Sequence, residues 1–206
     1  MTTADPAQPR PGEDLRRRKL LDAAIGVFMR FGFRKTSMDE VARAADVSRQ
    51  GVYLHFATKE DLFRAAVQQV LESSLEAAAG CLGDAALPVE KRLVGAFDEW
   101  MGRFVGMMRP GSTAGAADLG EASDALVGPA VAEHDKLFAE ALTKALRSAG
   151  LVSAYKPAGL TARQLADTLI ATARGLKHSC DSRAEFVERL THAVRAMCMP
   201  LREGAR

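Results

Sequence analysis

Cysteine is scarce in this chain of 206 residues. Its three cysteines, Cys81, Cys180 and Cys198, have no metal-ligand spacing and cannot complete an even disulfide framework, which favours free thiols in a reducing compartment. No apolar run approaches the roughly 20 residues that a membrane-spanning helix needs, and the polar opening MTTADPAQPRPGED differs from a signal peptide. The sequence therefore predicts a cytoplasmic protein with no membrane partner.

Constellations of catalytic side chains are also missing. The histidines at positions 55, 134, 178 and 192 have no metal-ligand spacing, and no nucleophile stands in a motif with a base and an orienting group. The sequence thus predicts neither an enzyme nor a bound metal or cofactor.

The net charge is close to zero, at +2, but the charges are unevenly distributed. The first 60 residues hold 11 Lys and Arg against 8 Asp and Glu, whereas the remainder holds 17 against 18. The basic run from Arg16 to Lys19 is either a solvated helix face or a set of phosphate contacts. So small an excess indicates nucleic acid only when a motif accompanies it.

Such a motif occupies residues 36–59, TSMDEVARAADVSRQGVYLHFATK. Ser37 and Glu40 have the spacing of a capping box at the start of one helix, and Ser48 can cap a second helix a few residues later. Asp46 stands in the tight turn between them, at a position often given to Gly, because Asp tolerates a left-handed backbone. Two helices joined so closely predict a helix-turn-helix. Its expected core residues are Val47, Val52 and Phe56.

The rest of the chain shows helical periodicity and no strand alternation, so the expected class is all-α. A disordered arm is expected at residues 1–13, where three prolines occur. Further helices are expected at 14–31, 58–79, 88–108, 129–150, 162–178 and 183–199, with a loop at 109–128 that holds one short helix at 120–126.

The last two of these helices predict a hairpin through which two copies of the chain could pair. Thr161 with Gln164, and Ser182 with Glu185, have the spacing of capping boxes. Two such hairpins could form a four-helix seam, which predicts a homodimer. The expected interface residues are Leu165, Leu169, Ala173, Leu176, Phe186, Leu190, Val194 and Met197.

With these elements in place, the sequence resembles the TetR family of transcriptional regulators. The resemblance rests on residues 26–63, GVFMRFGFRKTSMDEVARAADVSRQGVYLHFATKEDLF, and on the order of the helices that follow. It implies about nine helices: a three-helix DNA-binding domain with the helix-turn-helix at residues 14–60, joined to a larger helical ligand-binding and dimerisation domain at 61–206. The chain departs from the common family pattern at Asp46, Gln50 and Gly51.

The resemblance places the second helix of the motif in the major groove of a palindromic operator. Arg49 and Gln50 lie in its first turn, and we expect them to contact base edges, because Arg suits guanine and Gln suits adenine. Gly51 either lets the backbone approach the DNA or is simply a small residue in a crowded position. The candidate phosphate contacts are Thr36, Ser37, Ser48, Tyr53, His55, Thr58 and Lys59.

The resemblance also implies a homodimeric repressor that a small apolar or amphipathic molecule releases from DNA. Candidate pocket residues are Phe97, Trp100, Met101, Phe104, Met108, His134 and Phe138, with Met107 and His178 as further possibilities, and each could equally be ordinary core. Two alternatives stay open. One is a thiol-based redox regulator that uses Cys180 or Cys198, and the other is a helical interaction module that binds no DNA.

Overall fold

The computed structural model describes residues 11–106 and 116–203, and within these ranges every regular element is helical. This confirms the all-α class and the expected number of helices. The α-helices are α1 (Pro11–Phe31), α2 (Met38–Ala44), α3 (Arg49–His55), α4 (Lys59–Gly83), α5 (Val89–Trp100), α6 (Ala116–Ser148), α7 (Leu151–Ala154), α8 (Ala162–Ser179) and α9 (Arg183–Glu203), with 3-10 turns η1 (Gly102–Phe104) and η2 (Lys156–Ala158).

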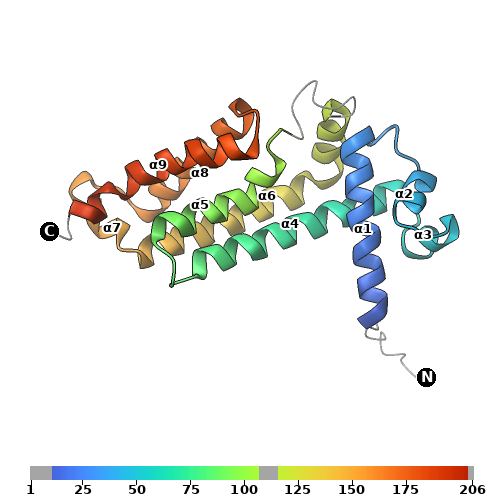
Figure 1. Cartoon of the computed structure of the whole chain (residues 1–206), viewed down its shortest axis with the longest axis horizontal. Helices are drawn as coiled ribbons and strands as arrows, with labels where there is room; N and C mark the ends of the chain where they lie inside the picture. The colour runs from blue at the N-terminus through green and yellow to red at the C-terminus, as the bar shows by residue number, and fades with distance from the viewer. Residues whose placement is uncertain (1–10, 107–115, 204–206) are drawn as a thin grey trace.

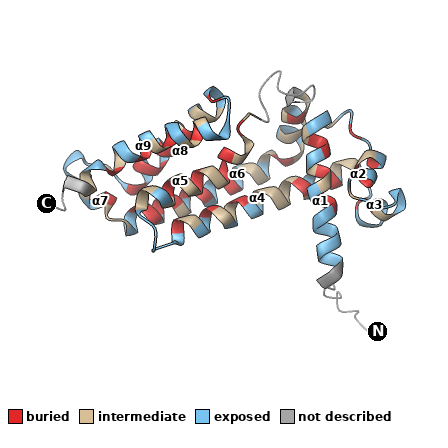
Figure 2. Ribbon diagram, in the orientation of Figure 1, coloured by how far each residue is buried: buried red, intermediate tan, exposed pale blue. Residues whose placement is uncertain are grey.

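Helices α1, α2 and α3 form a head at one end of the elongated molecule, and α1 crosses α4 steeply there (Figure 1). Helices α4, α5 and α6 run along the long axis, with α8 and α9 packed beside them and the C-terminus far from the head. Helix α4 begins in the head and continues into the body, as the sequence predicted. The buried side chains line the surfaces where these helices meet (Figure 2).

Two hydrophobic cores divide the molecule. The head core joins α1, α2 and α3 to Leu62, Phe63 and Ala66 of α4, and it also takes Leu119 and Val127 from α6. The head therefore extends beyond the expected boundary at residue 60. The larger core is built by α4 to α9, with its largest buried side chains Phe97, Phe138, Phe186, Leu93, Leu142 and Leu169.

Residues 109–115 of the expected loop lie outside the described residues, but the loop and short helix expected at 116–128 were wrong, as was a helix start at Pro129. Helix α6 is continuous from Ala116 to Ser148 with Pro129 inside it. Proline is accepted there at the loss of one backbone hydrogen bond, and the flanking turns of α6 are held by packing in both cores. Tertiary contacts thus outweigh the weak helix propensity of a segment rich in glycine.

The helix expected to reach Met108 is shorter, because α5 ends at Trp100 and gives way to the turn η1. Gly102 fits closely against the side chain of Asp98, whose carboxylate accepts two hydrogen bonds from Arg183 at 2.7 and 2.8 Å. The segment 151–159, between two of the expected helices, contains α7 and η2. The first ten residues of the expected arm lie outside the described residues, and α1 begins at Pro11.

The α8–α9 hairpin forms as expected, but its apolar stripe faces the core of its own chain. Thr161 and Gln164 make a complete capping box, whereas Glu185 accepts from the backbone of Asp181 rather than from Ser182. Six of the residues expected at a dimer interface are at most 2% exposed: Leu165, Leu169, Ala173, Phe186, Leu190 and Val194. Leu176 and Met197 are half-buried against the same core. A second copy would have to meet the outer face of the hairpin instead.

Candidate nucleic-acid interface and ligand cavity

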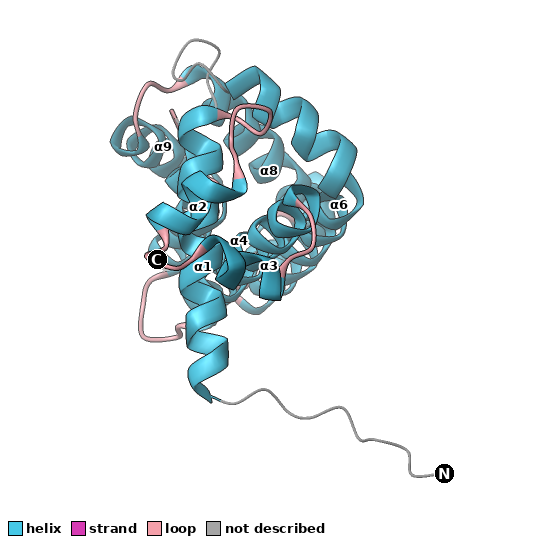
Figure 3. Cartoon of the chain, turned by 90° about the vertical axis from the view of Figure 1, so that its right-hand side faces the viewer, coloured by secondary structure: helices cyan, strands magenta, loops and turns pink. Residues whose placement is uncertain are grey.

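The α2–α3 unit has the local geometry that its capping residues predict. The Ser37 hydroxyl accepts from the backbone of Glu40, whose carboxylate accepts in return from the Ser37 N–H at 2.7 Å. The Ser48 hydroxyl accepts from the Gly51 N–H at 3.0 Å at the start of α3. Asp46 adopts a φ of 54° between the two helices, which confirms its left-handed turn position. The unit lies at the outer end of the head (Figure 3).

Helix α3 has one buried and one exposed face. Val52 is completely buried and Phe56, at its end, is 5% exposed, so both anchor the helix in the head core as expected. Val47 is 42% exposed and was wrongly expected in that core, since the left-handed turn before it directs the chain outward. Arg49 and Gln50 lie in the first turn on the exposed face. Their side chains are therefore free to meet a large partner.

Arg49 is held in position by two neighbours. Its Nη1 donates to Oδ2 of Asp39 at 3.2 Å, and its guanidinium lies 5.6 Å from the ring centre of Tyr53. Asp39 belongs to α2, so the ion pair bridges the two helices of the motif. The contacts with Tyr53 and Asp39 raise the pKa of the Arg49 guanidinium, which stays cationic.

Five of the expected phosphate contacts are exposed, on α3 or at the starts of α2, α3 and α4. Ser37, Ser48 and Thr58 are exposed helix caps, and His55 is exposed at the end of α3. Tyr53 is 43% exposed. These five could approach a duplex backbone from one side of the head.

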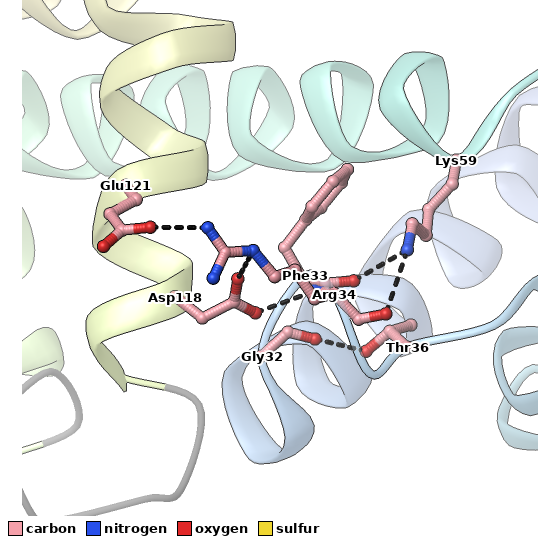
Figure 4. Close-up of polar contacts among 7 residues, drawn as sticks. All are labelled: Gly32, Phe33, Arg34, Thr36, Lys59, Asp118 and Glu121. Atoms are coloured by element: carbon pink, nitrogen blue, oxygen red, sulfur yellow. Dashed lines mark hydrogen bonds and ion pairs between the residues drawn. The ribbon is translucent and has the colours of Figure 1, made fainter.

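Thr36 and Lys59, by contrast, are engaged inside the head (Figure 4). Thr36 is 2% exposed and donates its hydroxyl to the Gly32 carbonyl at 2.6 Å, so that hydroxyl is turned away from any partner. The Lys59 ammonium donates to the carbonyl oxygens of Phe33 at 2.9 Å and Arg34 at 3.3 Å. It also lies 4.5 Å from the centre of the Phe33 ring. Lys59 thus holds the α1–α2 connection against α4, and Thr36 closes that connection from within.

A cavity of about 400 Å³ lies between the head and the body. The expected residues Trp100, Met101 and Phe104 line it. Its other apolar walls come from α1, α4 and α6: Ile25, Met29, Phe63, Val67, Val70, Leu71, Leu119 and Val131. Polar groups enter from Ser74, Ser123, Asp124, Asp135, Arg174, Lys177 and His178.

Three residues expected in the pocket belong elsewhere. Phe97 and Phe138 lie beneath the cavity in the larger core, where Phe138 stacks on Trp100 at 5.0 Å between ring centres. His134 is 7% exposed and its Nδ1 lies 2.8 Å from the Ala130 carbonyl oxygen, so it is a satisfied buried histidine. Met108, with Met107, lies outside the described residues.

The sequence reasoning missed a clamp that joins the head to α6 (Figure 4). The Arg34 N–H donates to Asp118 Oδ2 at 2.7 Å, and its guanidinium binds Glu121 Oε2 at 2.7 Å. Leu119, Gly120 and Ser123, on the same turns of α6, line the cavity. No local pattern marks this clamp, because its partners are more than 80 residues apart in the chain.

Comparison with known proteins accounts for the head. The family model for bacterial regulatory proteins of the tetR family matches residues 20–66, which includes the whole α2–α3 unit. The head therefore matches the DNA-binding domain of the TetR family. This family consists of transcriptional regulators, which are not enzymes.

The TetR-family relatives match over only part of this chain. The chain is 40% identical over 63 residues to the HTH-type transcriptional regulator YfiR of Bacillus subtilis, a stretch that is 31% of either chain. It is 45% identical over 47 residues to AcrR of Shigella flexneri, which covers 23% of this chain and 22% of AcrR. The match thus spans less than a third of these relatives' own length.

The TetR fold, however, extends over the whole chain. A TetR-like transcriptional regulator from Rhodococcus sp. RHA1 superposes with a TM-score of 0.57 and 25% identity, covering 97% of this chain and 99% of that one. FadR from Bacillus halodurans superposes with a TM-score of 0.59 at 16% identity, covering 91% and 96%. No helix in the described parts of the chain is long and apolar enough to cross a membrane.

The cysteines of this chain are poorly placed to sense oxidants. Cys180 is completely buried and Cys198 is 1% exposed. Cys81 is half-buried, and burial together with nearby carboxylates raises the pKa of its thiol, which lowers the reactive thiolate fraction. The structure therefore gives no support to the redox alternative.

Proposed function

We propose that the protein is a cytoplasmic, sequence-specific DNA-binding regulator that acts as a homodimeric repressor. The observation that carries this proposal is the split character of α3: Val52 fixes it in the head core, while Arg49 and Gln50 project from its first turn. A helix presented in this way can enter the major groove, where Arg reads guanine and Gln reads adenine.

The phosphate contacts proposed beside α3 differ in kind from these base contacts. Ser37, Ser48 and Thr58 stand at helix starts, and Tyr53 and His55 lie on or beside the exposed side of α3. They would fix the position of the head on the duplex without reading its sequence. Thr36 and Lys59 are left out of this set, because their polar groups are already bound within the head.

Dimerisation is proposed through the outer face of the α8–α9 hairpin rather than through its buried stripe. Exposed small residues lie along α8 at Thr168, Ala171 and Gly175, where another helix could approach closely. Two recognition helices in one dimer would have to lie about 34 to 36 Å apart to occupy successive major grooves. Chemical crosslinking or sedimentation of the Gly175→Trp variant would show whether dimerisation uses this face of the hairpin.

A ligand response is supported by the way α6 touches both the cavity and the head. Ser123 and Leu119 face the cavity, while Asp118 and Glu121 bind Arg34. A ligand that fits the cavity better when these turns of α6 have moved would shift the head, and this differential affinity is the coupling that release requires.

The proposal is tested with the full chain on duplexes selected from a randomised library. Binding to the selected site should exceed binding to random DNA by at least about a thousandfold, and both should fall steeply as salt rises. The double variant Arg49→Ala, Gln50→Ala should lose the preference for the selected site. Equal binding to both duplexes, with no loss in the double variant, would show that α3 is not a recognition helix and would favour an interaction module.

A further inference from the structure

The charged side chains that line the cavity differ in whether an ion pair or water stabilises their charge. Asp135 and Arg174 form an ion pair with 2.7 Å between Oδ2 and Nη2. Asp124 is exposed, so water can solvate its carboxylate. Lys177 is half-buried and makes no hydrogen bond or ion pair with any residue that the structure describes. One cation is therefore left without a partner at the cavity wall.

The surroundings of Lys177 are unfavourable for its charge. Burial is the main cause that lowers the pKa of its ammonium, and Arg174 adds repulsion, while attraction from Asp135 opposes both. The Asp135 carboxylate is already bound by Arg174. A partly desolvated charge whose nearest carboxylate is already paired with another cation is costly, so an anion beside Lys177 would be attracted.

The remainder of the cavity is lined mainly by aliphatic, aromatic and methionine side chains. Met29, Val70, Leu71, Met101 and Phe104 contribute from three different regions of the fold. Its volume of about 400 Å³ lies within the range typical of small-molecule sites. These walls can accommodate an apolar chain, because their side chains have few polar groups that would need a hydrogen-bond partner.

We propose that the cavity binds a monocarboxylate amphiphile, with the carboxylate at Lys177 and the apolar chain among the residues of α1, α4 and η1. This deepens the proposed function by giving the chemical class of the effector. The binding step itself can be measured without DNA, so the two proposals can fail separately.

Trp100 provides the signal, because it is the chain's one tryptophan and lines the cavity. We would titrate the full chain with decanoate, decanol and decyltrimethylammonium, which share a chain and differ in head-group charge. All three would be kept below micelle-forming concentrations, with circular dichroism to confirm that the helices persist. Decanoate should bind about 10- to 100-fold more tightly than decanol, and the cation more weakly than either.

Variants at position 177 test the role of the ammonium. Lys177→Met should remove the preference for decanoate over decanol while leaving decanol binding within about twofold, because the apolar stem is kept. Lys177→Arg should retain most of the preference. Lys144→Met removes an exposed lysine from another helix, α6. It should change neither the preference for decanoate nor the binding of decanol.

The outcomes separate cleanly. Tighter binding of decyltrimethylammonium, an unchanged preference in Lys177→Met, or no response of Trp100 to decanoate would each overturn the anionic-amphiphile proposal. Operator release by the cationic amphiphile would overturn it and leave the proposed regulator intact. Decanoate binding at Lys177 in a chain that binds no DNA would uphold the site and reject the regulator.

Discussion

The side chain and backbone of Arg34 both bind the carboxylate of Asp118, through N–H to Oδ2 at 2.7 Å and Nε to Oδ1 at 3.2 Å. This contact ties the loop between α1 and α2 to the first turns of α6. The Asp118 side chain is 18% exposed and that of Arg34 is 74% exposed, so only the carboxylate end of the pair is shielded from water.

Removing the side-chain part of the clamp, while the backbone N–H of residue 34 can still bind Asp118, should weaken the coupling between the cavity and the head. With Arg34→Ala, an amphiphile that binds the cavity should still bind, but its effect on operator affinity should fall several-fold, since allosteric couplings of about 1 to 3 kcal/mol depend on such contacts. Fluorescence anisotropy of labelled operator with and without the ligand measures this. Lys136→Ala, which removes an exposed ion pair with Glu133 later in α6, is the matched control and should leave the coupling unchanged.

Arg49 and Gln50 should determine which DNA sequence is bound, whereas the helix cap Ser48 should affect all DNA sequences equally. Gln50→Ala should weaken the selected site by about 1 to 3 kcal/mol and relax one base position. Ser48→Ala should weaken cognate and random duplexes alike. Competition with single-base variants of the site measures both effects, and an equal loss on all sequences for Gln50→Ala would remove it from the base readers.

The left-handed backbone at Asp46 predicts a stabilising substitution. Asp46→Gly should raise the free energy of unfolding by up to about 1 kcal/mol, because glycine adopts a φ of 54° without a Cβ penalty. Ala45→Gly is the matched control, since Ala45 is helical with a φ of −88° and should lose about 0.5 to 1 kcal/mol. Urea unfolding followed by circular dichroism measures both. A destabilised Asp46→Gly variant would show that the Asp46 side chain itself supports the turn.

Lys59 should matter to the stability of the head. Lys59→Met removes hydrogen bonds to the Phe33 and Arg34 carbonyls, and we expect a loss of about 1 to 2 kcal/mol in unfolding free energy. Any loss of DNA affinity should then follow the unfolded fraction and recover at lower temperature. The neighbouring exposed Lys35→Met should not change stability.

Lys177 should be a site where stability is sacrificed for binding. Burial lowers the pKa of its ammonium in the folded protein, so the charge costs stability in full below the folded pKa, and the cost shrinks as pH rises through that pKa. The penalty disappears only as pH rises through the higher pKa of the unfolded chain. Lys177→Met should therefore raise the thermal unfolding midpoint at pH 7, and the difference from the parent should shrink in alkali. Differential scanning calorimetry at the two pH values checks both statements.

The sequence predicts those features that depend on interactions between residues close together in the chain. Ser37, Ser48, Thr58 and Thr161 act through atoms three residues away, so their caps could be read directly. The sequence wrongly predicted a helix start at Pro129, because proline has a low helix propensity. Packing of α6 in two cores keeps the helix continuous through that residue. The sequence alone could show neither the inward direction of the α8–α9 stripe nor the position of Lys177, since both depend on which helices surround them.

Helix α6 has a consequence for the exchange of parts between members of the family. The segment that matches the family model ends at residue 66, yet the head core is closed by Leu119 and Val127, which are 6% and 5% exposed. A chimera that transplants residues 1–83 onto another regulator's body would uncover this part of the core. Grafting should succeed only when the donor's first turns of α6, through Pro129, are moved together with the head.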